Sequence, residues 1–213
     1  KINDQTVLAG LDLRRDIEKM IGDTNVARAS GTPRKSASLI TWITNGDKPS
    51  DMAFATGDGS DVADLTGTAR SLTLAQIDAS MQAAWSDGGN PRLLVASAGN
   101  RANISDLSQA GTNLVTNQVN TTAAKPVSFN GAVSILFNDF GQLEVIPSRF
   151  MSNDKVFLID PDHVAVGAIN GRNFVEQEIA ATGDAQKRQI LCEWTLMPDA
   201  PKAHAAVIGL DGS

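Results

Sequence analysis

The spacing of apolar residues changes along this 213-residue chain, and that change constrains the fold more than any other feature. Between Asp4 and Ile21 apolar residues recur at helical spacing, whereas from about Val133 onward they form short runs separated by turn residues. A chain that places helices before a series of strands folds as an α+β protein. The length allows one large domain or two smaller ones, and we expect two lobes.

The amino-terminal helix is predicted from Asp4 to Ile21, with Gly22 as a stop signal. Its apolar positions form a broad stripe: Val7, Leu8, Leu11, Ile17, Met20 and Ile21. Because a helix with such a stripe is stable only when another surface covers it, this helix needs a partner. The polar stretch from Asn25 to Gly67 is interpreted as a long connection, in which the apolar island from Leu39 to Ile43 docks on the protein.

The second helix has the clearest local signal in the sequence. Thr73 is its N-cap, and Gln76 three residues later completes a capping box. Its apolar stripe consists of three residues: Ile77, Met81 and Trp85. A short strand from Leu93 to Ala96 and a helix from about Arg101 to Gln109 follow, and this helix-strand-helix order predicts an α+β lobe.

The remainder of the chain has the pattern of strands separated by turns. The predicted strands are Val133 to Phe137, Leu143 to Ile146, Val156 to Ile159, Val164 to Ile169, Phe174 to Ile179, Arg188 to Leu196 and Ala203 to Leu210. Asn138 to Gly141 is predicted as a hairpin turn, and Asp160 to His163 and Asn170-Gly171 as further turns. These strands account for most of the expected sheet structure.

Composition and charge exclude several classes of protein. A formal net charge of −6 and a pI near 4.8 argue against a dedicated nucleic-acid binder, which would need clustered Lys and Arg to neutralise phosphates. Cys192 is the only cysteine, so the chain cannot form an internal disulfide. No apolar run approaches membrane-spanning length. We therefore expect neither sequence-specific nucleic acid nor a membrane among the partners.

The common catalytic templates are also missing from the sequence. It contains no phosphate-binding glycine loop, dinucleotide fingerprint, nucleophile elbow or paired metal-binding histidines, so we expect no catalytic, metal or cofactor-binding residues. Gly57 to Asp61 is rich in oxygen ligands but lacks the acid spacing of a calcium loop, which favours a surface turn. Glu176 and Glu178 face one side of a predicted strand, where a solvated face or an intersubunit salt bridge is expected.

An alternative interpretation is a hydrolase whose site lies around Asp160, Asp162 and His163. His163 lies in a predicted turn beside Asp160 and Asp162, but a metal there would need further ligands. We therefore interpret His163 as a turn residue. His204, in an apolar strand, is expected to be a satisfied packing residue, and Cys192 an inert small hydrophobe.

Four segments in the last third of the chain follow one another in a distinctive order: Phe140 to Phe150, Val156 to Pro161, Ala180 to Leu191 and Glu193 to Leu196. In this order they resemble the major head proteins of tailed bacteriophages. The first helix, with Arg14-Arg15-Asp16, resembles the long spine helix of that family's Hong Kong ninety-seven coat fold. The second helix, with Trp85 to Pro91, resembles the first helix of its axial lobe.

The resemblance implies a fold with two parts. Residues 1–70 and 170–213 would form a peripheral domain, made of the spine helix and long antiparallel strands. Residues 71–169 would form an axial domain with a central sheet flanked by helices. The amino-terminal arm and extended loop that precede the spine helix in the family are expected to be absent from this chain, which would then be truncated.

The resemblance also implies a structural function. The chain would be a subunit of an icosahedral phage or prophage capsid, assembled in the host bacterial cytoplasm and located in the virion. Its partners would be copies of itself, in hexamers and pentamers around double-stranded DNA, together with scaffold or portal proteins; no cofactor is expected. The hypothesised subunit-contact residues are Arg14, Arg15, Glu18, Arg149, Asp184, Lys187 and Arg188. The nearest alternative is the shell protein of an encapsulin-like nanocompartment.

Overall fold

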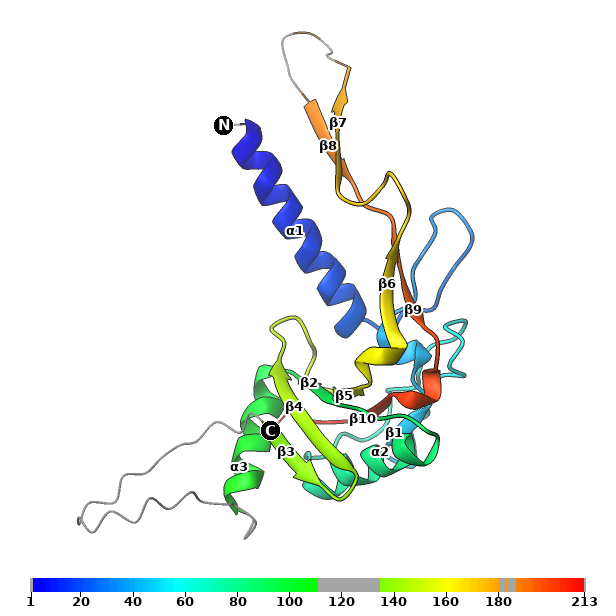
Figure 1. Cartoon of the computed structure of the whole chain (residues 1–213), viewed down its shortest axis with the longest axis vertical. Helices are drawn as coiled ribbons and strands as arrows, with labels where there is room; N and C mark the ends of the chain where they lie inside the picture. Colours follow the sequence, from blue (N-terminus) through cyan, green and yellow to red (C-terminus); the bar gives the residue numbers. More distant parts are fainter. Residues whose placement is uncertain (1, 111–134, 181–182, 184–186, 213) are drawn as a thin grey trace, which may run out of the picture.

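A mixed six-stranded sheet lies at the centre of the computed structural model, which describes residues 2–110, 135–180, 183 and 187–212 (Figure 1). Its strands, in spatial order, are β1 (Asn45–Asp47), β10 (Ala205–Ile208), β5 (Lys155–Ile159), β2 (Leu93–Ala96), β4 (Gly141–Pro147) and β3 (Ile135–Asn138). The pairs β1–β10 and β2–β4 are parallel, and the other three pairs are antiparallel. With its helices this sheet confirms the predicted α+β class.

The two faces of the sheet bury two separate apolar clusters, because successive strand residues point to opposite sides. On β5, Val156 and Leu158 pack in the cluster that includes residues of α2 (Leu74–Ser86) and α3 (Ala98–Ala110). Phe157, between them, packs in the other cluster, which residues 37–65 of the long connection cover. The apolar island docks there as the buried 3-10 helix η1 (Leu39–Trp42), as predicted.

The capping box of α2 is formed as predicted, but the predicted apolar stripe is only partly buried. Thr73 Oγ1 accepts from the backbone N–H of Gln76, and the Gln76 side chain accepts from the Thr73 N–H. Ile77 and Met81 are buried, whereas Trp85 is 56% exposed. Each four-residue step turns a side chain by about 40°, which moves Trp85 off the buried face and away from the core of this chain.

The third helix begins earlier than predicted. It starts at Ala98 and not near Arg101, because Ser97 acts as an N-cap whose Oγ accepts from the Asn100 N–H at 3.4 Å. The buried Asn100 side chain in turn donates to the backbone oxygen of Asn153 at 2.9 Å. The helix start is thereby fixed to the segment that leads into β5.

Turn residues in the sequence predict the β3–β4 hairpin, but no local pattern predicts strand β1. The hairpin turn is found at Asp139-Phe140 as predicted, and the Asn138 side chain accepts from the Phe140 N–H at 3.2 Å. Strand β1 is not predicted by its polar residues and forms by pairing with β10. Gly46, at φ +133°, permits this pairing, since a Cβ there would lie 1.8 Å from the Ala206 carbonyl oxygen.

A two-stranded arm and the helix α1 (Ile2–Gly22) project from the body in the same general direction (Figure 1). In the arm, β6 (Val164–Ala168) pairs with β9 (Trp194–Pro198), and β7 (Val175–Ile179) pairs with β8 (Lys187–Leu191). The single strand predicted from Arg188 to Leu196 is therefore wrong. The opposing strand bends between residues 170 and 174, where Gly171 and Phe174 have positive φ, so the ladder is interrupted.

A short helix links the central sheet to the arm. The predicted turn at Asp160–His163 contains this 3-10 helix, η2 (Pro161–His163), which carries the chain from β5 in the central sheet to β6 in the arm. β10 lies in the central sheet, between β1 and β5. The chain therefore enters the arm after η2 and leaves it after Pro198.

Candidate subunit-contact surface

Helix α1 lies beside the arm with a large part of its surface open. None of its described residues from position 4 to 22 is fully buried. The inner edge, which includes Gly10 and Leu13, is half-buried, while Val7, Leu8 and Leu11 are 64%, 60% and 43% exposed. The apolar stripe predicted to need a partner therefore has only part of that partner within this chain.

The contact between α1 and the arm is incomplete. The Arg14 guanidinium lies over the Phe174 ring, 5.2 Å from its centroid, and Thr6 Oγ1 donates to Glu176 at 3.5 Å. Two cavities of about 290 and 600 Å³ nevertheless lie between the helix and strands β7 and β8. Protein interiors do not contain gaps of this size, so the helix and arm are not packed as a core.

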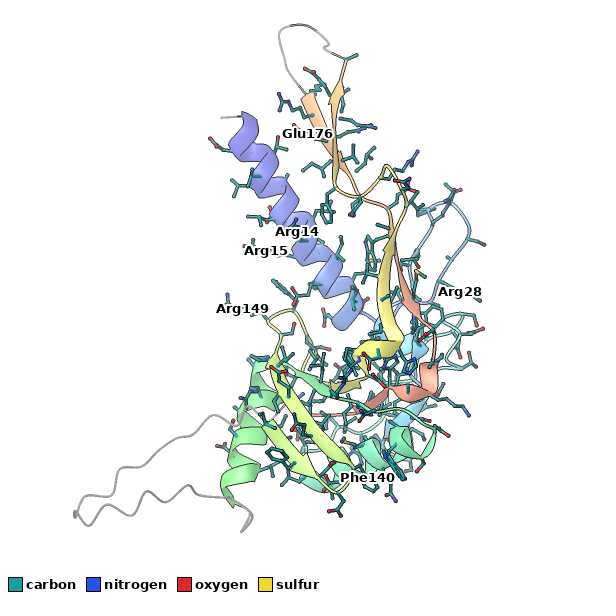
Figure 2. All side chains as sticks on the ribbon, viewed as in Figure 1. Arg14, Arg15, Arg28, Phe140, Arg149 and Glu176 are labelled. Atoms are coloured by element: carbon teal, nitrogen blue, oxygen red, sulfur yellow. The ribbon has the colours of Figure 1, made fainter. Side chains whose placement is uncertain are left out.

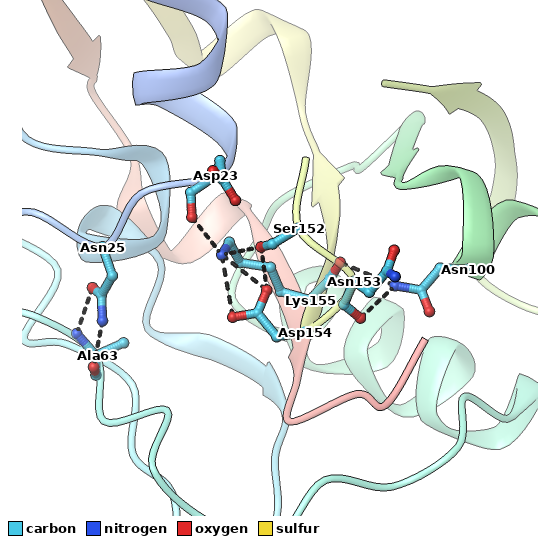
Figure 3. A network of polar contacts seen from close by, with 8 residues as sticks. All are labelled: Asp23, Asn25, Ala63, Asn100, Ser152, Asn153, Asp154 and Lys155. Carbon is cyan, nitrogen blue, oxygen red and sulfur yellow. Dashed lines mark hydrogen bonds and ion pairs between the residues drawn. The ribbon is translucent and has the colours of Figure 1, made fainter. Parts of the chain in front are cut away.

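The base of α1 is anchored firmly to the body, through a buried lysine (Figure 3). Lys155, at the start of β5, is 1% exposed, and its ammonium group donates to the Asp23 carbonyl oxygen at 2.8 Å. It also donates to Ser152 Oγ at 2.7 Å and to Asp154 Oδ1 at 3.0 Å. This network joins the residue after α1 to the central sheet, so the helix is positioned from its carboxyl end.

The hypothesised contact residues fall into two places. Figure 2 shows Arg14 and Arg15 on α1 and Arg149 near the base of that helix. There Glu18 accepts from Ser148 Oγ at 3.1 Å, and Arg15 pairs with Asp12 at 3.1 Å.

The second group lies far from the first, at the outer part of the arm. Lys187 and Arg188 begin β8, and Arg188 pairs with Glu176 of the same chain at 2.8 Å. Glu176 and Glu178 both lie on β7, as predicted. Because Arg188 belongs to the same chain, its ion pair with Glu176 is internal and not an intersubunit salt bridge. Asp184 lies outside the described residues.

The residues of the alternative hydrolase site have structural contacts. The buried Asp160 carboxylate accepts from the Asn90 N–H at 2.9 Å, and His163 pairs with Asp199 at 3.1 Å. His204 is buried, as predicted, and its Nδ1 accepts from the Asp160 N–H at 3.1 Å. Burial lowers the pKa of His204, because the charged imidazolium would lose its hydration.

The acidic surface turn at Gly57 to Asp61 uses its carboxylates within the turn. Asp58 accepts from the Ser60 hydroxyl and backbone N–H at 2.6 and 2.8 Å, and these bonds lower its pKa to about 2. Asp61 accepts from the Thr56 N–H at 3.0 Å. Within the described ranges, no group of three or more His, Cys, Asp or Glu side chains is placed to hold a metal ion.

A family model described as SU10 major capsid protein matches residues 1–211. The chain belongs to this family. No curated protein matches it. As a major capsid protein, the chain is a structural subunit of a phage capsid, and membership implies self-assembly into a shell and a place in the virion. The described helices include none that is both long and apolar enough to cross a membrane.

Two features of this capsid protein escaped prediction from its sequence. The burial of Lys155 has no sequence signal, because a lysine before an apolar run is typical of a strand end. The other feature is a cationic loop with Arg28, Arg34 and Lys35, on the side of the arm where Figure 2 labels Arg28. A usable signal exists for this loop, since residues 24–46 contain these three basic residues and no acidic one.

Proposed function

We propose that this capsid subunit has the Hong Kong ninety-seven coat fold. Helix α1 corresponds to the spine helix and, with the arm from Val164 to Pro198, forms the peripheral domain. The six-stranded sheet with α2 and α3 forms the axial domain. The projection of α1 and the arm from one sheet-centred body supports this division (Figure 1). In this proposal the sheet topology replaces the residue ranges expected from the sequence.

The subunit assembles into the hexamers and pentamers of an icosahedral shell that encloses double-stranded DNA. The observation that carries this proposal is the apolar surface left open on α1 and the arm. On the helix, Val7 and Leu8 are exposed. On or beside the arm strands, three further apolar side chains are 50% to 57% exposed: Val166, Ile169 and Met197. Exposed apolar surface of this kind marks contact sites between proteins, and family membership supplies copies of the chain as the partner.

The hypothesised residues contribute to contacts at two places. Arg14, Arg15 and Glu18 on α1 and Arg149 near the base of that helix form one charged group, and Lys187 and Arg188 form another on the outer arm. Asp184 belongs to the second group by sequence. Scaffold or portal proteins are further partners in this proposal, and assembly takes place in the bacterial cytoplasm.

Assembly of the purified protein tests the proposal. Light scattering and negative-stain microscopy are expected to show rings, sheets or closed particles for the unsubstituted protein. Arg149→Glu is expected to reduce assembly, because it reverses an exposed charge at the base of α1. Lys202→Glu makes the same charge change at an exposed side chain of η3 (Pro201–Ala203) and serves as the matched control.

The outcomes separate the general proposal from the residue assignment. A strictly monomeric protein, with scaffold protein supplied and at high concentration, would contradict the shell function. Normal assembly of a folded Arg149→Glu variant would leave the shell function standing and remove Arg149 from the contact surface. Circular dichroism of each variant establishes that it is folded.

A further inference from the structure

A groove lies between the cationic loop and the arm, and Met20 near the carboxyl end of α1 also lines it. The amino-terminal half of α1 lies on the other side of the arm (Figure 1). Its volume is about 860 Å³. The residues of its lining that matter here are Arg34, Lys35, Ile169, Cys192, Trp194 and Met197. The groove is thus built from a loop and an arm that are far apart in the sequence, and it exists only in the folded chain.

The groove combines an apolar floor with a cationic rim. Ile169 and Met197 are 50% and 54% exposed, and an unbranched methionine side chain adapts readily to an incoming apolar surface. Arg34 and Lys35 on the loop are exposed. An acidic residue of the lining, Glu193, is ion-paired with Arg172. A complementary partner therefore has an apolar stripe and acidic, not basic, residues beside it.

The amino-terminal half of α1 has both of these properties. Val7, Leu8 and Leu11 form one exposed apolar patch, because residues three and four apart lie on the same helix face. Residues 2–13 include Asp4 and Asp12 and no Lys or Arg. Asp12 is paired with Arg15, but its side chain remains 69% exposed. In the same chain the inner edge of α1 packs toward Ile190 on β8, and Val7 and Leu11 also border the smaller cavity on that side.

We propose that the amino-terminal half of α1 from one capsid subunit docks in the groove of a neighbouring copy. This inference rests on the proposed shell function and names a contact for it. Because the amino-terminal half of α1 and the groove lie on opposite sides of the arm, each subunit uses one surface to receive a neighbour and the other to dock on the next. Such a contact is head-to-tail and repeats around a ring.

Cys192, which lines the groove, provides a direct test. Leu8→Cys places a second thiol on the docking patch, and mild oxidation of assembled protein with diamide would join it to Cys192 of the neighbour. Disulfide formation requires the two Cα atoms to lie within about 7 Å, so the cross-link reports contact and not mere proximity. A head-to-tail contact joins more than two copies, and we expect a ladder of dimers and higher multimers on a non-reducing gel.

The controls isolate the contact. The unsubstituted protein and Leu8→Cys/Cys192→Ser each lack one of the paired thiols, and the paired variant is expected to give roughly ten-fold more multimer than either. Val7→Cys and Leu11→Cys are tested in parallel to allow for the angle of docking. If the unsubstituted protein assembles but none of the three variants forms a ladder, the groove contact is refuted while the shell function stands. A dimer alone, or a cross-link within one chain, also refutes it.

Charge reversal gives an independent readout that does not depend on cysteine geometry. Lys35→Glu removes a cation from the rim, and we expect it to raise the protein concentration needed for assembly about five-fold. Lys202→Glu, outside the groove lining, is expected to leave that concentration unchanged. Equal effects of the two substitutions would contradict a role for the cationic rim. Failure of the unsubstituted protein to assemble, with scaffold protein supplied and at high concentration, would instead contradict the proposed function.

Discussion

Replacing Lys155 with methionine tests whether one buried ammonium group positions helix α1. The lysine side chain is 1% exposed and bonds to the Asp23 carbonyl, Ser152 Oγ and Asp154 Oδ1 at 2.7 to 3.0 Å. Methionine has a similar length and keeps the apolar part of the packing, but it has no donor. The substitution therefore removes the network and leaves the space occupied.

The expected loss of stability follows from the groups left behind. A hydrogen bond to a charged group contributes about 1.5–3 kcal/mol, and three are removed. Two effects reduce the loss: the Asp154 side chain is 40% exposed and regains water, and the neutral side chain no longer bears the cost of burying a charge. We expect a net decrease of about 2–3 kcal/mol in the free energy of unfolding, well below the sum of three bonds.

Urea denaturation measures the global effect, and hydrogen exchange of the unassembled subunit locates it. Amides in the last two turns of α1 are expected to exchange faster in Lys155→Met, because the residue after the helix loses its tie to β5. Lys202→Met, at an exposed position, is the matched control and is expected to change neither quantity. Unchanged exchange in α1 together with a full loss of global stability would show that Lys155 supports only the sheet.

Three further changes test the fold. Gly46→Ala should lower the free energy of unfolding by more than about 3 kcal/mol in urea, because its Cβ would overlap the Ala206 oxygen; Gly22→Ala, in open space, should change it by less than about 0.5 kcal/mol. Thr73→Ala removes the capping box and should cost about 1 kcal/mol in the same assay. Burial holds the pKa of His204 below its unfolded value of about 6.5, so the unfolded chain binds more protons and the melting temperature should fall as the pH drops below about 6.5. An unshifted NMR titration of His204 would contradict that last reasoning.

Features encoded by neighbouring residues were predictable from the sequence. The capping box at Thr73 and the Asn138 to Gly141 turn depend on side chains a few positions apart, and both form as predicted. Strand β1 was missed because Asn45–Asp47 has no apolar pattern and its conformation comes from pairing with β10, about 160 residues later. The break in the strand predicted from Arg188 to Leu196 likewise arises from the bend in the opposing strand.

The candidate site was predictable only in part, for a related reason. The apolar stripe of α1 correctly indicated that this helix needs a partner surface. The sequence cannot show which edge packs on the chain's own arm, since that depends on how the base of the helix is held by Lys155. It also could not separate an internal from an intersubunit ion pair at Glu176, because the distance to Arg188 is set by the β7–β8 register.

The central sheet of this subunit is well buried, whereas α1 and the arm are not, because a shell protein folds its body first and covers its remaining apolar surface with neighbouring copies. The central sheet has an apolar cluster on each face, and nearly every residue of β5 and β10 is buried, so the body can fold before a neighbour arrives. The described residues of α1 and the arm form no comparable cluster between them, and they keep cavities and exposed apolar side chains. A subunit that buried this surface within itself would have little left with which to bind its copies. The firm anchor at Lys155 limits the resulting freedom, because it holds the direction of α1 while the faces of the helix remain open to a partner.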